Sequence, residues 1–124
     1  MRIVFRDFPL KIHPGAMEAA MAARCAEEQG AFQQYHDALY TGRYGFSRPQ
    51  LEALAGSLGL DTAAFSACLD AEGSRRLVTR EIAQAQRLGV HVTPTFLIDG
   101  QRLVGEQSIS SFESVINAQL AAHR

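Results

Sequence analysis

The hydrophobic positions of the chain recur mostly at the spacing of an α-helix. Apolar side chains separated by three, four or eight residues fall on one face of a helix, and six stretches show this repeat. They run from Met17 to Cys25, Phe32 to Tyr40, Leu51 to Leu58, Phe65 to Leu69, Val78 to Ala85 and Phe112 to Leu120. The pattern therefore predicts a mainly helical chain.

Capping residues delimit several of these helices. Ser47 and Gln50 match a capping box, in which each side chain bonds the backbone of the other residue. Asp61 suits the N-cap of a short helix. Glycines at 30, 59 and 89 are placed to end helices, and the His13-Pro14 pair is expected to open the first one.

Short strands are predicted near both ends of the chain. Ile3–Phe5 reads as a strand, and a second, Thr95–Ile98, is joined to a third, Arg102–Val104, by Asp99-Gly100. Asp-Gly between apolar runs is typical of a type I′ hairpin turn. Thr93-Pro94 precedes the hairpin, and such a bond is either a cis proline at a tight turn or a trans proline that begins an edge strand.

Composition and charge narrow the classes of function. The 124 residues are 47% hydrophobic and 20% charged, with a formal net charge of −1, as in a single globular domain. The chain has no block of basic residues of the kind that binds nucleic acid, and it has no apolar run long enough to span a membrane. The first residues do not form a signal peptide, so the chain is expected in the cytoplasm if Met1 is its true start.

The order strand, helical block, hairpin and helix suggests a small α/β unit with a helical insertion. The whole chain resembles the DsbA-like thiol–disulfide oxidoreductases. The resemblance is carried by Phe5-Arg6-Asp7-Phe8-Pro9-Leu10, His13-Pro14, Ala19-Ala20, Cys25-Ala26, Glu28-Gln29-Gly30-Ala31-Phe32, Tyr35-His36-Asp37-Ala38-Leu39, Leu58-Gly59-Leu60-Asp61, Phe65, Cys68-Leu69-Asp70, Leu88-Gly89-Val90 and the Val92-Thr93-Pro94-Thr95-Phe96 loop.

The resemblance implies a single thioredoxin-like domain over 1–124 whose N-terminal βα unit is incomplete. Residues 1–12 and 89–124 would form parts of the thioredoxin core, and 13–88 the helical insertion and connecting helix. Family members begin with a strand and a Cys-x-x-Cys motif at a helix start, and this chain contains neither. The family parent is periplasmic or otherwise extracytoplasmic.

Three explanations of the missing motif stay open. The chain is a fragment, or a shortened non-redox module, or a half whose amino-terminal part comes from a separate polypeptide. If the place of the missing strand is unfilled, backbone donors and acceptors are left unpaired, which predicts self-association through unpaired strands.

The two cysteines, Cys25 and Cys68, lie 43 residues apart on predicted helices. They are either buried thiols or a structural disulfide. Some family members carry a second, non-catalytic disulfide in this region, and the resemblance therefore favours the bonded form. Neither cysteine is expected to be catalytic, since a reactive thiolate prefers a helix amino terminus or a cationic neighbour.

The candidate binding residues lie in the proline loop. By resemblance, Val92, Thr93 and Pro94, with His91 beside them, contact an extended substrate. The other reading of His91 is an exposed loop residue. The spacing of the four histidines fits no compact ligand set, so neither a metal nor a cofactor is expected.

The resemblance implies that the family parent oxidises or isomerises protein disulfides. Without a Cys-x-x-Cys motif, the chain of residues 1–124 is expected to be inactive alone. The implied partners are extended polypeptide or thiol substrates and a redox partner protein. The main alternative is a non-catalytic thioredoxin-like module for peptide binding or assembly. A third reading, the kappa-type glutathione transferase branch of the fold, needs no Cys-x-x-Cys.

Overall fold

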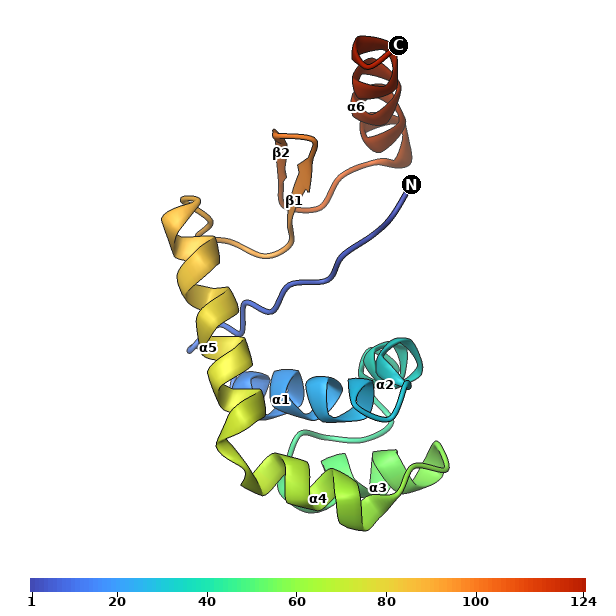
Figure 1. Cartoon of the computed structure of the whole chain (residues 1–124), viewed down its shortest axis with the longest axis vertical. Helices are drawn as coiled ribbons and strands as arrows, with labels where there is room; N and C mark the ends of the chain where they lie inside the picture. The colour runs from blue at the N-terminus through green and yellow to red at the C-terminus, as the bar shows by residue number, and fades with distance from the viewer. The chain divides into compact units, whose positions relative to one another are not determined.

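The computed structural model describes all residues 1–124 as six helices and one two-stranded sheet (Figure 1). The elements are α1 Ala16–Glu27, α2 Phe32–Leu39, α3 Arg48–Ser57, α4 Thr62–Asp70, α5 Glu72–Arg87, β1 Thr95–Ile98, β2 Gln101–Val104 and α6 Ile109–Ala122. They form two compact units, Met1–Gln84 and Ala85–Arg124. The assignment of 1–12 and 89–124 to one core stays a prediction.

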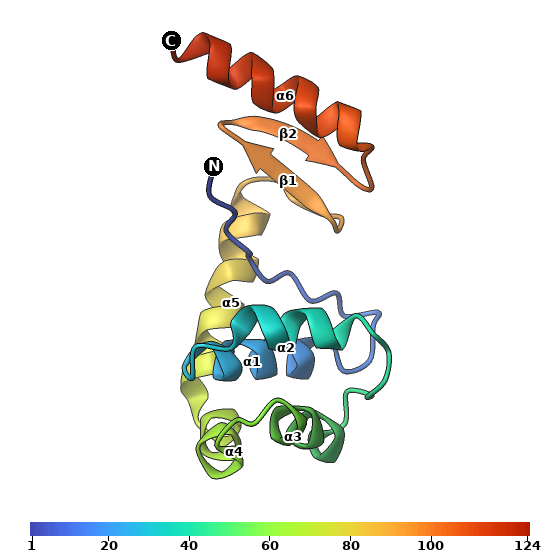
Figure 2. The same ribbon diagram turned by 90° about the vertical axis from the view of Figure 1, so that its right-hand side faces the viewer.

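Helix α1 is the centre of the helical unit, and it contacts α2, α3 and α4. Its residues Met21 to Ala26 are all buried, so the helix is covered on every side rather than on one stripe. The alanines there have no long side chain, and neighbouring helices can therefore approach closely. In Figure 2, α1 and α2 run side by side.

The rest of this core comes from aromatic and aliphatic side chains of the surrounding helices. Tyr35 and Phe65 are fully buried, and their ring centroids lie 5.5 Å apart. The Tyr35 hydroxyl donates a hydrogen bond of 2.9 Å to the carbonyl of Leu51, which satisfies its one polar atom. Burial raises the pKa of Tyr35, so the ring stays neutral.

Most predicted helix ends are confirmed. Ser47 and Gln50 form the capping box of α3, and the Asp61 side chain accepts from the amide of Ala64. Gly30 and Gly59 adopt positive φ values of 73° and 76° after their helices. The prediction that His13-Pro14 opens the first helix was wrong, because those residues lie in a turn and α1 begins at Ala16.

The predicted strand at Ile3–Phe5 is also wrong. Residues 1–10 form no strand or helix, and Figure 1 shows the amino-terminal segment as an irregular coil. A strand exists only when its backbone pairs with another strand, and the sheet consists of β1 and β2 alone. The apolar, β-branched residues of the segment favour a strand locally, but no second strand lies beside the segment to pair with it.

The second unit is the predicted hairpin followed by α6. β1 and β2 pair antiparallel, with Phe96 opposite Leu103 and Ile98 opposite Gln101. Asp99 and Gly100 both have positive φ, 49° and 86°, as a type I′ turn requires. Helix α6 lies along the hairpin, and the rings of Phe96 and Phe112 meet edge to face at 4.7 Å.

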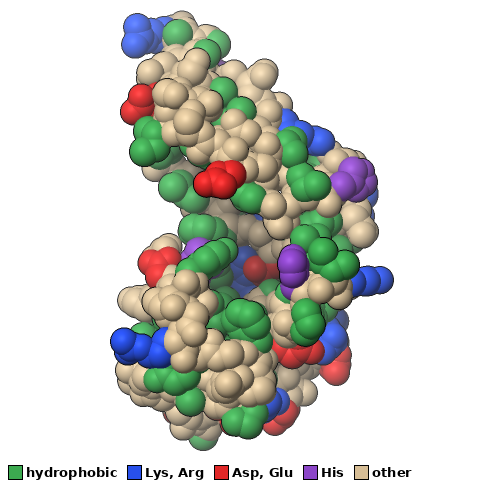
Figure 3. All heavy atoms as spheres, turned by 180° about the vertical axis from the view of Figure 1, so that it is seen from behind, with side chains coloured by type: hydrophobic (Ala, Val, Ile, Leu, Met, Phe, Trp, Pro, Cys, Tyr) green, Lys and Arg blue, Asp and Glu red, His purple; other side chains and the backbone are tan.

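Side chains of both charge signs are scattered over the face drawn in Figure 3, with no basic patch on that face. No helix combines the length and the apolar character that crossing a membrane requires.

Candidate functional site

The proline loop, residues 91–94, joins α5 to β1, and all four of its side chains are exposed. The Thr93–Pro94 peptide bond is cis. Two hydrogen bonds fix the loop to the hairpin. The Thr95 hydroxyl donates to the Val92 carbonyl at 2.7 Å, and the Gly105 amide donates to the Pro94 carbonyl at 2.7 Å.

Thr93 keeps its backbone groups free. Neither its N–H nor its C=O takes part in a hydrogen bond within the chain, although the residues on both sides of it are fixed. An exposed backbone donor and acceptor of this kind can pair with an extended peptide. The loop therefore offers Thr93 as a backbone contact, with Val92 and His91 as neighbouring exposed side chains.

Arg102 of β2 fixes the other end of the loop. Its guanidinium donates to the carbonyl of Gly89 at 3.3 Å and also to the carbonyl of Leu88. These carbonyls follow the end of α5, where helical partners are missing. This role of Arg102 was not predicted from the sequence, because it depends on a contact across 13 residues.

The histidines are dispersed. His36 packs among Phe5, Phe32 and Tyr40. His123 pairs with Asp99 at the hairpin turn. No group of three or more His, Cys, Asp or Glu side chains is arranged to hold a metal ion.

A disulfide joins Cys25 of α1 to Cys68 of α4, with 5.7 Å between their Cα atoms. The chain has no free cysteine. Cys25 is buried in the core of the helical unit. The bond therefore serves as a crosslink between two helices and leaves no thiolate to attack a substrate.

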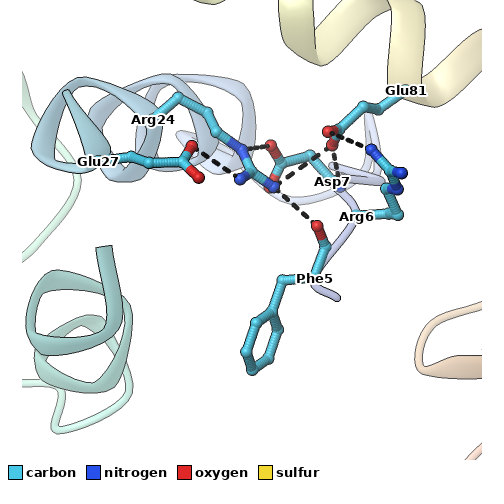
Figure 4. A network of polar contacts seen from close by, with 6 residues as sticks. All are labelled: Phe5, Arg6, Asp7, Arg24, Glu27 and Glu81. Carbon is cyan, nitrogen blue, oxygen red and sulfur yellow. Dashed lines mark hydrogen bonds and ion pairs between the residues drawn. The ribbon is translucent and has the colours of Figure 1, made fainter. Parts of the chain in front are cut away.

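A charge cluster with a buried centre, formed by Arg24, Asp7, Glu81, Glu27 and Arg6, lies in the helical unit (Figure 4). Arg24 is its centre and only 7% of this side chain is exposed. Its Nε lies 2.6 Å from Asp7, and its Nη atoms lie 3.0 Å from Glu27 and 3.4 Å from Glu81.

The cluster fastens the amino-terminal segment to the helices. Arg24 Nη2 also donates to the Phe5 carbonyl at 3.1 Å, and the Asp7 amide donates to Glu81 at 2.6 Å. The pKa of Asp7 is raised above its ordinary 3.8, chiefly because burial disfavours the carboxylate, although the Arg24 guanidinium opposes this.

The raised pKa of Asp7 predicts a pH-dependent stability. An acid with a higher pKa in the folded state binds protons more tightly there, so its contribution to stability falls as pH rises from 3.8 through the folded-state pKa. Asp7→Asn cannot titrate. The free energy of unfolding of the parent, measured with urea, is therefore expected to fall relative to Asp7→Asn across that window. If the free energies of unfolding of the parent and Asp7→Asn differ by the same amount throughout this pH window, the pKa of Asp7 is not raised in the folded state.

This cluster was not predicted from the sequence. Asp7 entered the prediction only as part of a family motif, and Arg24 did not enter it. One signal was available, namely an arginine flanked by two alanines and a cysteine on the apolar part of the helix. Such a charge is buried only when it is paired.

The model of a family described as Thioredoxin matches residues 1–118. The sodium/proton antiporter NhaA of Herminiimonas arsenicoxydans is 36% identical over 118 residues, which is 95% of this chain and 19% of the antiporter. NhaA 3 of Salinispora tropica is 34% identical over 126 residues, with 100% and 19% covered. The chain thus spans about a fifth of the length of these relatives.

Two solved structures superimpose on 94% of the chain, each with a TM-score of 0.81. One is a thioredoxin-like oxidoreductase from Silicibacter pomeroyi DSS-3, 26% identical, of which 66% is covered. The other is the thiol–disulfide exchange protein alpha-DsbA2 from Wolbachia pipientis, of which 64% is covered. At 19% identity, the second shows likeness of fold alone.

Proposed function

The chain belongs to the thioredoxin family, and from this membership we propose that it provides the substrate-binding part of a DsbA-like thiol–disulfide oxidoreductase. The thioredoxin-like fold and the likeness to DsbA-like proteins, both predicted from the sequence, are confirmed. The observation that carries the proposal is the exposed proline loop with the unpaired backbone of Thr93.

Exchange requires a thiolate that attacks one sulfur of a substrate disulfide and releases the other sulfur as a thiolate. Residues 1–124 contain no Cys-x-x-Cys, and both of their cysteines are bonded to each other. In the proposal, the attacking thiolate therefore belongs to a different polypeptide segment. Residues 1–124 alone bind the substrate but do not catalyse exchange.

The proline loop holds the substrate as an extended chain. The Thr93 N–H and C=O pair with the substrate backbone, which makes recognition independent of most substrate side chains. Val92 and Pro94 supply apolar contact beside this pairing, and His91 is a polar neighbour. Substrates are then unfolded or flexible segments that carry thiols or disulfides.

Binding at the loop is tested by titrating the isotope-labelled chain with a peptide, Gly-Val-Cys-Thr-Val-Gly, and recording amide chemical shifts. We expect the largest changes at residues 91–95. Thr93→Trp fills the space beside the loop and should weaken binding at least about tenfold, which corresponds to about 1.4 kcal/mol.

Thr79→Trp is the matched control, because Thr79 is also an exposed threonine but lies on α5. It should leave the titration unchanged. Shift changes confined to other residues, or equal binding by Thr93→Trp, would overturn the proposal for the loop. An assay of insulin reduction with the same chain should show no turnover.

A second candidate function is a non-catalytic peptide-binding or assembly module, favoured by the absence of any free cysteine. The two functions differ in their response to an added Cys-x-x-Cys segment. Supplying the amino-terminal part of a DsbA-like protein in trans should restore exchange under the first proposal and leave exchange absent under the second.

The named relatives suggest where such a domain works. Because the matched antiporters are about five times as long as the match, we infer that the chain acts as a thioredoxin-like domain attached to, or working beside, a larger membrane protein. The Cys25–Cys68 bond supports an oxidising, extracytoplasmic location. A redox partner protein and self-association through unpaired strands remain part of this proposal.

A further inference from the structure

Helix α5 has one face in the core and the opposite face in solvent. Ser74, Val78 and Glu81 are its buried residues, and their spacing of four and three places them on one side of the helix. Arg76 and Arg80 each follow a buried residue by two positions, and two positions turn a helix by about 200°. These two arginines therefore lie opposite the buried side.

Arg75 precedes this pair, and we call the three residues Arg75, Arg76 and Arg80 the arginine face. All three side chains are exposed, and all three belong to the helical unit. None of them makes an ion pair, and every ion pair of the chain engages another basic side chain. Their guanidinium donors are therefore not neutralised by any carboxylate of the protein.

The arginine face is a local concentration of positive charge. The chain has a formal net charge of −1, yet four of its 12 basic residues lie between positions 75 and 87. Glu81 is the one acidic residue between positions 73 and 98, and it is buried and paired with Arg24. The other acid of the helix is Glu72, one turn before Arg76. The exposed side of α5 is thus positive.

The exposed side of α5 also has no apolar anchor. A helix that enters the boundary of a lipid bilayer needs an apolar face on the membrane side. Within the helical unit, the exposed positions of α5 are Glu72, Gly73, Arg75, Arg76, Thr79, Arg80 and Gln84. The face is therefore suited to bind by charge at a surface, without insertion. Guanidinium groups bind phosphate oxygens especially well, since two N–H donors match two oxygens.

We propose that the arginine face lies on an anionic membrane surface, where its guanidinium groups bind the phosphates of lipid headgroups. The proposal rests on the proposed function, in which the domain is attached to, or works beside, a larger membrane protein. Each arginine near an anionic leaflet favours the bound state about fivefold, and three together favour it on the order of a hundredfold.

An attraction of this size orients the domain rather than recruiting it. A freely diffusing protein would bind only at high lipid concentration. A domain tethered to a membrane protein meets the surface at a roughly millimolar effective concentration, so a weak preference for one face is sufficient. The arginine face thus turns the outer side of α5 toward the lipid.

Co-sedimentation of the full chain with vesicles of phosphatidylglycerol and phosphatidylcholine in low salt tests the proposal. We expect binding that disappears with phosphatidylcholine alone and weakens as added salt screens the charges. The double variant Arg76→Gln, Arg80→Gln should bind about 25-fold more weakly. The double variant Arg76→Lys, Arg80→Lys keeps the charge and should bind within about twofold of the parent.

Two further variants separate the arginine face from net charge. Glu72→Gln removes the acid beside Arg76 and should strengthen binding about fivefold, a gain that loss of structure cannot produce. The matched control is the double variant Lys11→Gln, Arg43→Gln, which removes two charges from exposed loop positions and should bind as the parent does. Urea unfolding of every variant should match the parent, because the changed side chains are exposed and make no ion pair.

Binding that does not depend on phosphatidylglycerol, or equal binding by Arg76→Gln, Arg80→Gln, would overturn the proposal. Displacement by soluble glycerol phosphate at constant ionic strength would assign the face to a single phosphate group and overturn the membrane as its partner. Tighter binding of a DNA duplex, with the same dependence on the arginines, would assign it to nucleic acid and also overturn the proposal.

The proline loop provides the test of independence from the peptide site. Thr93→Trp is expected to lose peptide binding, but it should bind vesicles as the parent does. A failure at the vesicles therefore leaves the peptide site standing, and a failure of peptide binding leaves the arginine face standing.

Discussion

Arg24→Met is expected to destabilise the protein by about 3 to 5 kcal/mol. Methionine keeps most of the side-chain stem but removes the guanidinium that pairs with Asp7 and Glu81. Glu81 is 5% exposed, and without Arg24 its carboxylate lies buried beside a second carboxylate. The amino-terminal segment also loses its bond at the Phe5 carbonyl. Urea unfolding followed by circular dichroism measures the loss.

Arg48→Met is the matched control, because Arg48 also pairs with two carboxylates but is 41% exposed. Exposed ion pairs contribute little, so a loss below about 1 kcal/mol is expected. Adding Glu81→Gln to Arg24→Met should recover part of the loss by removing one unpaired charge. Equal losses for Arg24→Met and Arg48→Met would show that the buried cluster has no special role in stability.

The double variant Cys25→Ala, Cys68→Ala is expected to lose about 4 kcal/mol, from the entropy of closing a loop of this length in the unfolded chain. The two cysteines are separated by 43 residues, and they join α1 to α4 directly. Lost packing of the buried Cys25 sulfur adds to the effect. The urea midpoint should therefore fall strongly, while the spectrum of the folded protein stays helical.

Reduction provides the control for this pair. Dithiothreitol should move the midpoint of the parent toward that of the double variant and should leave the variant unchanged. Thiol titration of the denatured, unreduced parent should find no free thiol. A parent whose midpoint ignores dithiothreitol would contradict a stabilising role for the bond.

The helices could be predicted because their signals are local. The capping box at Ser47 and Gln50, and the Asp61 cap, each act over a few neighbouring residues. The Asp99-Gly100 turn is equally local. The Ser108 cap of α6 was missed although its signal is of the same kind, since the side chain accepts from the Ser111 amide.

The strand at Ile3–Phe5 failed for the opposite reason. Its residue types favour a strand, but a strand forms only when it pairs with a second segment, which can be distant in sequence. Here no strand pairs with it. The charge cluster escaped prediction because its contacts span up to 74 residues. The proline loop could be predicted from the sequence. The hydrogen bond from Arg102 to the Gly89 carbonyl, just after α5, could not.

The disulfide also makes part of the chain a covalent ring. Residues 25–68, which include α2 and α3, are closed by the Cys25–Cys68 bond. A protease that cuts the exposed stretch around Arg43 breaks the ring without separating the protein. The two pieces of the nicked molecule stay joined by the disulfide until a reductant separates them, so a cut at this loop would not divide the protein wherever the disulfide stays oxidised.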